Sequence, residues 1–296
     1  MTNTWKNPTL IAQYALATLW DEMQMLPLVS RDFTQEVQAG AGATITYRQE
    51  PVLTAGDYDP LVGVVAQDIT EATDTIVLNQ HKYVTLKITD LETTLDIDDY
   101  QRRVIRPAMM PLAAAVDTAI LALRSDITAS ITASAYDAST NPHPGFDLID
   151  ARRTLTTAKV PKTDRACVVD EYIGAQWLRD DLFNRADARG PRGTSALTEG
   201  DVGRAFGFDT YETGHIDDFT GIAFHPSAFQ VVFAPLALPK GAARAEYMNF
   251  QGLPIRVVYS YDPTYLTDMI TFDLLFGTKT TDPTRAVLIN GLADSV

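Results

Sequence analysis

The residues that could do chemistry are few and scattered along the chain. The 296 residues include four histidines and a single cysteine. None of His81, His143, His215 and His225 has a histidine, a cysteine or an acid at the spacing of a metal motif such as H-E-x-x-H. Cys167 lies in the strand-like run Arg-Ala-Cys-Val-Val, which indicates a small buried side chain and not a nucleophile. We therefore expect no metal, no cofactor and no enzymatic activity.

Two further patterns lack the residues that would complete a ligand site. Asp96, Asp98 and Asp99 could bind a divalent ion, but the alternating ligands and closing glutamate of a calcium loop are absent. These acids are better explained as the start of a helix, where negative charge is favoured. Gly40 and Gly42 form a G-x-G without the third glycine of a dinucleotide-binding turn.

The composition narrows the classes of function further. The chain is 46% hydrophobic and 21% charged, which is typical of a folded protein with a sizeable core. Acids outnumber bases by 38 to 24, for a formal net charge of −14. A sequence-reading nucleic-acid binder normally has a basic face, so this balance argues against one. The sequence has no charge-free apolar stretch of about 18 residues, and we expect no membrane span.

The elements that would position functional residues begin with a helix. Apolar residues recur every three or four positions between Pro8 and Met25, including Leu10, Tyr14 and Trp20. The segment after it is not helical, so this helix is isolated in the sequence. Two interpretations are open: the helix packs on its own domain, or it is an arm that docks on a neighbouring subunit.

The next segment predicts an extended β-hairpin. Strand patterns occur at 44–48, 75–78 and 83–88, and a polar stretch rich in Gly, Pro and Asp fills residues 50–74. A long hairpin buries little apolar surface and is marginal in water by itself. We therefore expect this hairpin to lie on another surface, and a neighbouring copy would supply one.

The rest of the chain predicts a long helix and an α/β unit. Apolar residues recur every three or four positions from Ile97 to Ile127, which predicts a long helix. Because Pro107 and Pro111 lie inside this pattern, we expect a bent spine or two helices in tandem. The string Asn-Pro-His-Pro-Gly at 141–145 marks a boundary. Helices and strands then alternate up to the C-terminal region.

The order of these segments resembles the major capsid (coat) proteins of tailed bacteriophages, which have the Hong Kong 97-type fold. Each matching string is short, and their shared order over nearly the whole chain carries the resemblance. One departure is Ala43, where the similar coat proteins usually have aspartate. The strings are Pro8–Ala12, Leu28–Phe33, Gly42–Arg48, Leu78–Val84, Ile97–Tyr100, Gly203–Tyr211, Ala223–Ala228, Pro239–Arg244 and Asp273–Gly277.

The resemblance implies an α+β fold of four parts. Residues 1–36 would be an N-arm and 37–90 an extended E-loop hairpin. Residues 91–140 and 265–296 would form a P-domain with a long spine helix, and 141–264 an A-domain.

The resemblance also implies a function. Copies would assemble as hexamers and pentamers into the icosahedral shell of a virion in the host cytoplasm. The shell would enclose double-stranded DNA without sequence-specific binding and without a membrane. Scaffolding, portal and decoration proteins are further partners of such shells. The alternatives are an encapsulin-like compartment and, from a different class, a soluble α/β hydrolase or metal enzyme.

We expect subunits to be held in register by ion pairs between acids of the hairpin and arginines of a neighbour's spine helix. Single exposed pairs contribute only about 0–1 kcal/mol, so they would set register more than strength. The acids are Asp57, Asp59, Glu71 and Asp74, and the bases are Arg102, Arg103 and Arg106.

Overall fold

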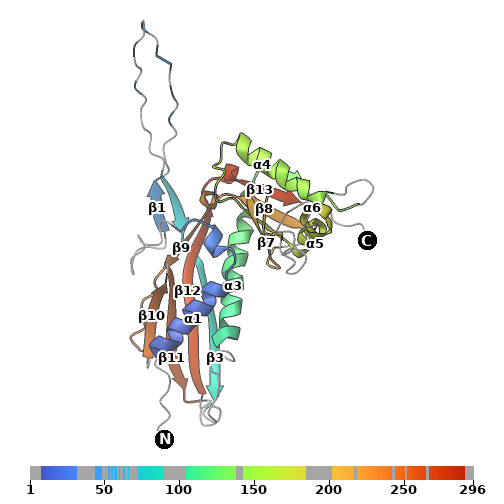
Figure 1. Ribbon diagram of the computed structural model, residues 1–296. Coiled ribbons are helices and arrows are strands. Elements are labelled where there is room, and N and C mark those ends of the chain that lie inside the picture. Colours follow the sequence, from blue (N-terminus) through green and yellow to red (C-terminus); the bar gives the residue numbers. More distant parts are fainter. Residues whose placement is uncertain are drawn as a thin grey trace.

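Two β-sheets form the framework of the protein in the computed structural model (Figure 1). A two-stranded hairpin is attached to one of them. The structure describes residues 8–31, 44–48, 73–89, 105–137, 143–184, 202–216, 219–241, 244–250, 252–264 and 267–290, together with isolated positions between 53 and 66.

The larger body is built on a five-stranded antiparallel sheet. The strand β12 is its centre, and alternate residues such as Ile270, Phe272 and Phe276 are fully buried, as expected of a strand with one face on the core. The strands are β10 (Arg244–Phe250), β11 (Leu253–Asp262), β12 (Thr267–Thr280) and β3 (Gln80–Thr89), with β9 (Phe229–Ala234) paired to the end of β12.

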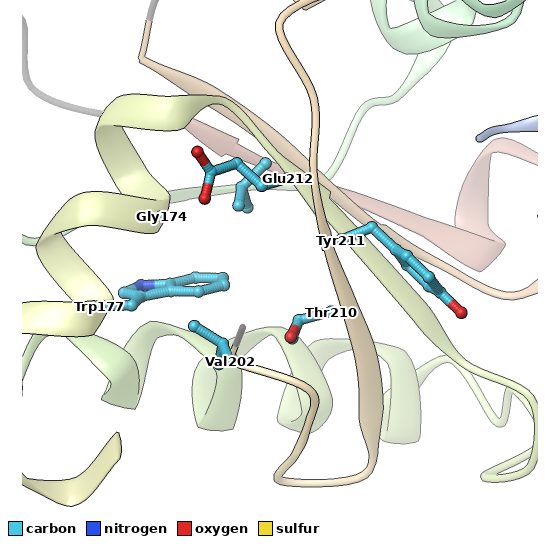
Figure 2. Close-up of a pocket in the computed structure, with 7 residues that line it drawn as sticks. Gly174, Trp177, Val202, Thr210, Tyr211 and Glu212 are labelled. Carbon is cyan, nitrogen blue, oxygen red and sulfur yellow. The ribbon is translucent and has the colours of Figure 1, made fainter. Parts of the chain in front are cut away.

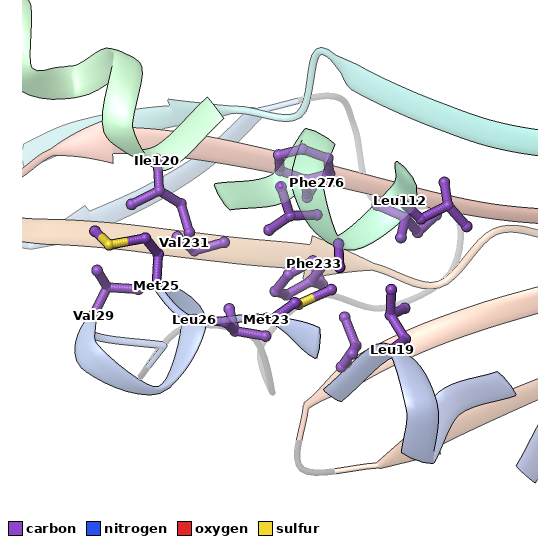
Figure 3. Packing of buried hydrophobic residues seen from close by; sticks show 14 of the residues in the cluster. Leu19, Met23, Met25, Leu26, Val29, Leu112, Ile120, Val231, Phe233 and Phe276 are labelled. Atoms are coloured by element: carbon purple, nitrogen blue, oxygen red, sulfur yellow. The ribbon is translucent and has the colours of Figure 1, made fainter. Parts of the chain in front are cut away.

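Two helices cover the buried face of this sheet. The helix α1 (Pro8–Glu22) packs on β10, β11 and α3 (Arg106–Leu121). Leu19 of α1 and Phe233 of β9 are 0% exposed, and Figure 3 shows them in one cluster with Leu112. The interpretation that the N-terminal helix docks on a neighbour is therefore wrong for α1, because its apolar stripe is buried in its own chain. Short 3-10 helices follow both elements, η1 (Leu26–Leu28) and η4 (Ala122–Asp126).

The two prolines of the spine do not divide its described part. Pro107 lies in the first turn of α3, where its missing N–H costs no helical bond, and the helix continues through Pro111. Residues 90–104 lie outside the described residues.

One helix of the described part, Arg106–Asp126, is long and apolar enough to cross a membrane. Length and composition are weak evidence for that, and Leu112 and Val116 of this helix are at most 1% exposed in the protein core.

A six-stranded mixed sheet forms the second body, in the order β4-β13-β8-β5-β7-β6. Trp177, Phe208 and Cys167 are at most 1% exposed in its core, so the prediction of a buried cysteine is confirmed. Burial also raises the pKa of the Cys167 thiol, which disfavours the thiolate. The strands are β4 (Ser130–Thr132), β5 (Ala166–Val169), β6 (Arg204–Ala205), β7 (Phe208–Glu212), β8 (Thr220–Phe224) and β13 (Ala286–Asn290). The helices are η5 (Pro144–Phe146), α4 (Asp147–Thr157), α5 (Glu171–Arg179) and α6 (Asp181–Asn184).

The chain crosses between the two sheets more often than the sequence suggested. It passes from β8 to β9 through η7 (Pro226–Ala228) and from β12 to β13 through η8 (Pro283–Arg285). The expected A-domain range 141–264 is therefore split between both sheets, because β9, β10 and β11 belong with β12. The expected P-domain range 265–296 likewise includes β13, which belongs to the six-stranded sheet.

The expected hairpin is present at its base. The strand β1 (Thr44–Arg48) pairs antiparallel with β2 (Thr73–Val77), and Figure 1 shows the pair beside β9. Ile76 is 0% exposed against Val232 of β9. A Cβ at Gly277 would lie 2.3 Å from the Val77 carbonyl oxygen, so only glycine lets β12 and β2 approach this closely. The strand β3 belongs to the five-stranded sheet and not to the hairpin.

Candidate assembly surfaces

The acid Asp74 has its partners inside its own chain. The ammonium group of Lys279 on β12 donates to the Asp74 carboxylate, and Tyr47 Oη donates to it at 3.1 Å. The hydrogen bond from Lys279 is the main reason why the pKa of Asp74 lies below its ordinary value. This ion pair fastens β2 to the sheet, so Asp74 positions the hairpin base.

The base Arg106 is likewise paired within the chain. Its Nε and Nη2 atoms both lie 2.9 Å from Glu22 Oε1, which joins the start of α3 to the end of α1. The Arg106 side chain is still 63% exposed. The structure therefore gives Asp74 and Arg106 intrachain roles, and their pairing with a neighbour stays a prediction.

The other predicted contact residues are divided between exposed and undescribed positions. Asp57 is exposed. Asp59, Glu71, Arg102 and Arg103 lie outside the described residues, so their pairings stay predictions.

The described residues of the hairpin tip include two large exposed apolar side chains. Leu53 is 59% exposed and Tyr58 is 71% exposed. Side chains of this type anchor protein interfaces when a partner covers them. Sequence reasoning singled out the acids of this segment, and the exposure of these two residues became clear only from the structure.

A buried acid that the sequence analysis missed ties α1 to α3. Asp117 is 1% exposed on α3 and accepts the backbone N–H groups of Gln24 at 2.9 Å and Met25 at 3.1 Å. Burial raises the pKa of this carboxyl group, and the two hydrogen bonds and His215 oppose the rise. The only sequence signal was an acid inside an otherwise apolar helical face.

A second buried acid joins three strands. Asp273 of β12 is 3% exposed, and Arg256 of β11 donates to both of its oxygens, from Nε at 3.0 Å. His81 Nε2 of β3 lies 3.0 Å from Asp273 Oδ2. A buried charge is tolerated when it is paired and hydrogen-bonded in this way. The alternation of β12 already marked Asp273 as facing away from the apolar core.

The two crossings between the sheets share a polar brace. Ser227 Oγ lies 2.7 Å from His225 Nδ1 and also accepts from Arg285 Nη1 at 2.7 Å. Arg285 Nε donates to Asp282 Oδ2 at 3.0 Å. Because the Ser227 backbone N–H also donates to His225 Nδ1, at 3.3 Å, this serine–histidine pair forms a turn that braces η7 against η8. Burial, followed by the charge of Arg285, lowers the pKa of His225.

Two features of the described residues bear on ligand binding. Within it, no group of three His, Cys, Asp or Glu residues could hold a metal ion. A cavity of about 30 Å³ lies between α5 and β7. Figure 2 shows Glu212 on one side of the Trp177 ring and Val202 and Thr210 on the other. This volume holds about one water molecule and no substrate.

Comparison with known proteins gives structural matches only. No family model matches the chain, and no curated protein matches its sequence. A protein of Mycobacterium phage Che8 superposes with a TM-score of 0.66 and 23% identity, over 90% of this chain and 91% of that one.

Two further structures extend this likeness. A chain from the capsid of the cyanophage P-SCSP1u gives a TM-score of 0.63 and 14% identity, over 90% and 87% of the two chains. A chain of the virus-like particle from Pyrococcus furiosus superposes with a TM-score of 0.55 and 10% identity, over 95% of this chain and 98% of that one. The α+β fold with its long helix is therefore the Hong Kong 97-type fold of tailed-phage capsid proteins, as the collinear strings of the sequence predicted.

Proposed function

We propose that this chain is the major capsid protein of a tailed bacteriophage, whose copies assemble into the icosahedral shell of the virion. The observation that carries the proposal is the superposition on the Mycobacterium phage Che8 protein, which extends over nine-tenths of both chains. A match of this extent includes both sheets and the long helix, so it supports the whole architecture and not one common motif. The role is structural and non-enzymatic.

The exposed hairpin tip supports an assembly role. Leu53 and Tyr58 are solvent-exposed in the single chain, and a neighbouring copy would cover them. Many modest contacts of this kind add up when they are repeated around a closed shell. We propose that the shell contains hexamers and pentamers assembled in the host cytoplasm, and that scaffolding, portal and decoration proteins are its further partners.

The excess of acidic over basic residues is consistent with a shell that encloses DNA. With a net charge of −14, the chain would hold double-stranded DNA by enclosure and not by dense phosphate contacts. Such a shell encloses DNA of any sequence.

We further propose that the chain divides functionally into an N-arm (1–36), an E-loop, a P-domain and an A-domain. The pairing of strands supports assigning β3 and β9–β12 to the P-domain together with α3, on which α1 of the N-arm packs. It supports assigning β4–β8, β13 and α4–α6 to the A-domain, and β1 with β2 to the base of the E-loop.

The second candidate is an encapsulin-like protein compartment. It is favoured by the superposition on the virus-like particle from Pyrococcus furiosus, which covers 98% of that chain. The likeness to the Che8 protein is greater in TM-score and identity, so we place the phage capsid first.

Electron microscopy of the purified chain, with and without a co-expressed scaffold, tests the proposal. We expect closed icosahedral shells. Small discrete oligomers under every condition would refute it. Shells filled with a single cargo protein and free of DNA after expression in the natural host would instead support the compartment.

A further inference from the structure

We propose that neighbouring copies of this chain contact each other head to tail through the six-stranded sheet, the basic edge of one copy lying against the acidic edge of the next. The basic edge consists of Arg152, Arg153, Lys159 and Lys162. The acidic edge consists of Glu171 and Glu212. This inference rests on the proposed assembly function and specifies its partner chemistry.

The two edges lie at opposite ends of β5. Lys159 and Lys162 belong to the turn that leads into this strand, and Glu171 begins the helix that follows it. The strand β7 runs parallel to β5 and ends at Glu212, on the same side as Glu171. Four strand residues separate the two ends by about 13 Å. The sheet therefore has a positive and a negative end, which is the polarity that a head-to-tail contact requires.

The basic edge is held in a fixed shape. Arg165 is 2% exposed and donates from Nη2 to the Val160 carbonyl at 2.8 Å and from Nε to the Pro161 carbonyl at 2.7 Å. These bonds fold the turn back on the end of α4 and present Lys159 and Lys162 to solvent. A turn whose backbone is fixed loses less conformational entropy on association than a flexible loop.

The charges of the basic edge are largely uncompensated. Arg153 lies 3.7 Å from Asp150, but both side chains are more than 60% exposed and this contact is weak. Among the described residues, none forms an ion pair with Lys159 or Lys162. A shallow depression beside them is lined by Arg153, Thr154, Thr157 and Ala158.

The acidic edge is equally unpaired. Glu171 and Glu212 are exposed, and within the described part of the chain no cation pairs with either of them. Burial, followed by the charges of Glu171 and Asp170, raises the pKa of Glu212, and an incoming cation would relieve this repulsion.

In the acidic edge, the Glu212 carboxylate lies close to the backbone of α5. A Cβ at Gly174 would lie 2.6 Å from Glu212 Oε2, so the glycine leaves room for the carboxylate against α5. Figure 2 shows Glu212 beside the cavity that Trp177 lines. The indole Nε1 of Trp177 is buried and has no acceptor among the described residues. A lysine or arginine of the neighbouring copy would supply the cation that the Glu212 carboxylate lacks.

A second copy fits the basic edge better than DNA does. Asp150 and Asp164 lie among the four bases, and the whole chain carries −14. A protein that makes about 6–10 phosphate contacts uses more cations than the four of this edge, and the two acids would repel phosphate. Two complementary patches on different ends of one molecule make a heterologous contact, which closes into a ring when the rotation allows it.

Charge reversal and charge exchange test the inference in the full-length chain. One variant carries Lys159→Glu and Lys162→Glu, a second carries Glu171→Lys and Glu212→Lys, and a third combines all four. Glu171→Gln with Glu212→Gln removes the charge at nearly constant shape. Lys240→Glu changes an exposed lysine on the loop between β9 and β10, away from both edges, and is the control. The readout is the yield of closed shells in low and high salt, with circular dichroism to confirm folding.

We expect each reversal to lower the shell yield by about tenfold in low salt, the combined variant to recover it, and Lys240→Glu to leave it unchanged. Reversal variants that are folded and assemble like the wild type would overturn the inference, as would a combined variant that recovers nothing. Lysine-reversal variants that assemble normally but no longer retain DNA would also overturn the inference, because the basic edge would then contact phosphate and not a second copy. Failure of the wild type to form shells would instead count against the proposed function.

Discussion

At the scale of single residues, buried acids hold separate elements together. Asp117 links α3 to the end of α1, and Asp273 links β3, β11 and β12. Asp147 does the same in the second body, where it accepts from the Ser134 backbone N–H at 2.6 Å and from its hydroxyl at 2.9 Å. Each acid accepts several donors, which is the condition for keeping a carboxylate out of water.

The substitution Asp117→Ala should lower the free energy of unfolding by about 1–3 kcal/mol, because the buried N–H of Met25 and the partly buried N–H of Gln24 lose their acceptor. Asp117→Asn keeps one acceptor oxygen and should cost less. Chemical denaturation of the unassembled chain measures both. Equal and negligible effects would show that the hydrogen bonds to Asp117 contribute nothing to stability.

The histidine of the brace between the sheets predicts a pH dependence. The pKa of His225 is lower in the folded chain than its ordinary value, so the unfolded chain takes up the proton first as the pH falls. Stability contributed by neutral His225 is therefore complete above about pH 6.5 and is lost as the pH falls through the folded pKa.

The variant His225→Asn should remove this part of the pH dependence, because its side-chain oxygen can accept the Ser227 N–H without binding a proton. The measurement is the thermal midpoint of wild type and variant between pH 7.5 and pH 5. Curves that stay parallel over this range would contradict the assignment.

At the scale of elements, burial decides which segments depend on a neighbour. The helix α1 is buried along one stripe by its own sheet and by α3. The base of the hairpin has a small core of its own around Tyr47, Ile76 and Leu78, packed on β9. At the tip of the hairpin, by contrast, the described residues Leu53 and Tyr58 are exposed and could gain energy from burial by a partner.

The substitution Leu19→Ala should destabilise the isolated protomer by about 2–5 kcal/mol, since it leaves a cavity beneath α1. Tyr14→Ala, on the same helix but 45% exposed, is the matched control and should change stability by less than about 0.5 kcal/mol. Denaturation of the single chain in dilute solution separates the two variants. If both were neutral, α1 would contribute little to the stability of the protomer.

At the scale of the whole molecule, two sheets are joined by chain crossings that run in both directions. The 3-10 helices η7 and η8 meet at the brace formed by His225, Ser227 and Arg285. The hydrogen bonds of this brace therefore connect the two sheets at the point where the chain crosses between them.

Replacing Leu53 and Tyr58 by serine should leave the protomer as stable as the wild type but reduce the yield of shells by at least about tenfold, because exposed apolar groups gain energy only when a partner buries them. Thermal unfolding of the protomer and electron microscopy of the assembled material check the two parts separately. Unchanged assembly would exclude the hairpin tip as an anchor.

The sequence by itself determined the fold class, the N-terminal helix, the hairpin strands and the buried Cys167, because these depend on local periodicity and on apolar runs. It also determined the capsid-type fold through strings that keep their order along the chain. The acids Asp74 and Asp57 were recognised as charged hairpin residues, but their partners could not be read from local pattern.

Only the tertiary structure decided which strands share a sheet and which charges are already paired. The strand β12 pairs with β3 and with β9, which lie far from it in the sequence, as well as with its sequence neighbour β11, and pairings between distant segments cannot be read from local pattern. The pairs Asp74–Lys279 and Arg106–Glu22 bring together residues that no spacing rule connects. The helix α1 is buried by its own chain for the same reason: the surface that covers it is assembled from distant segments.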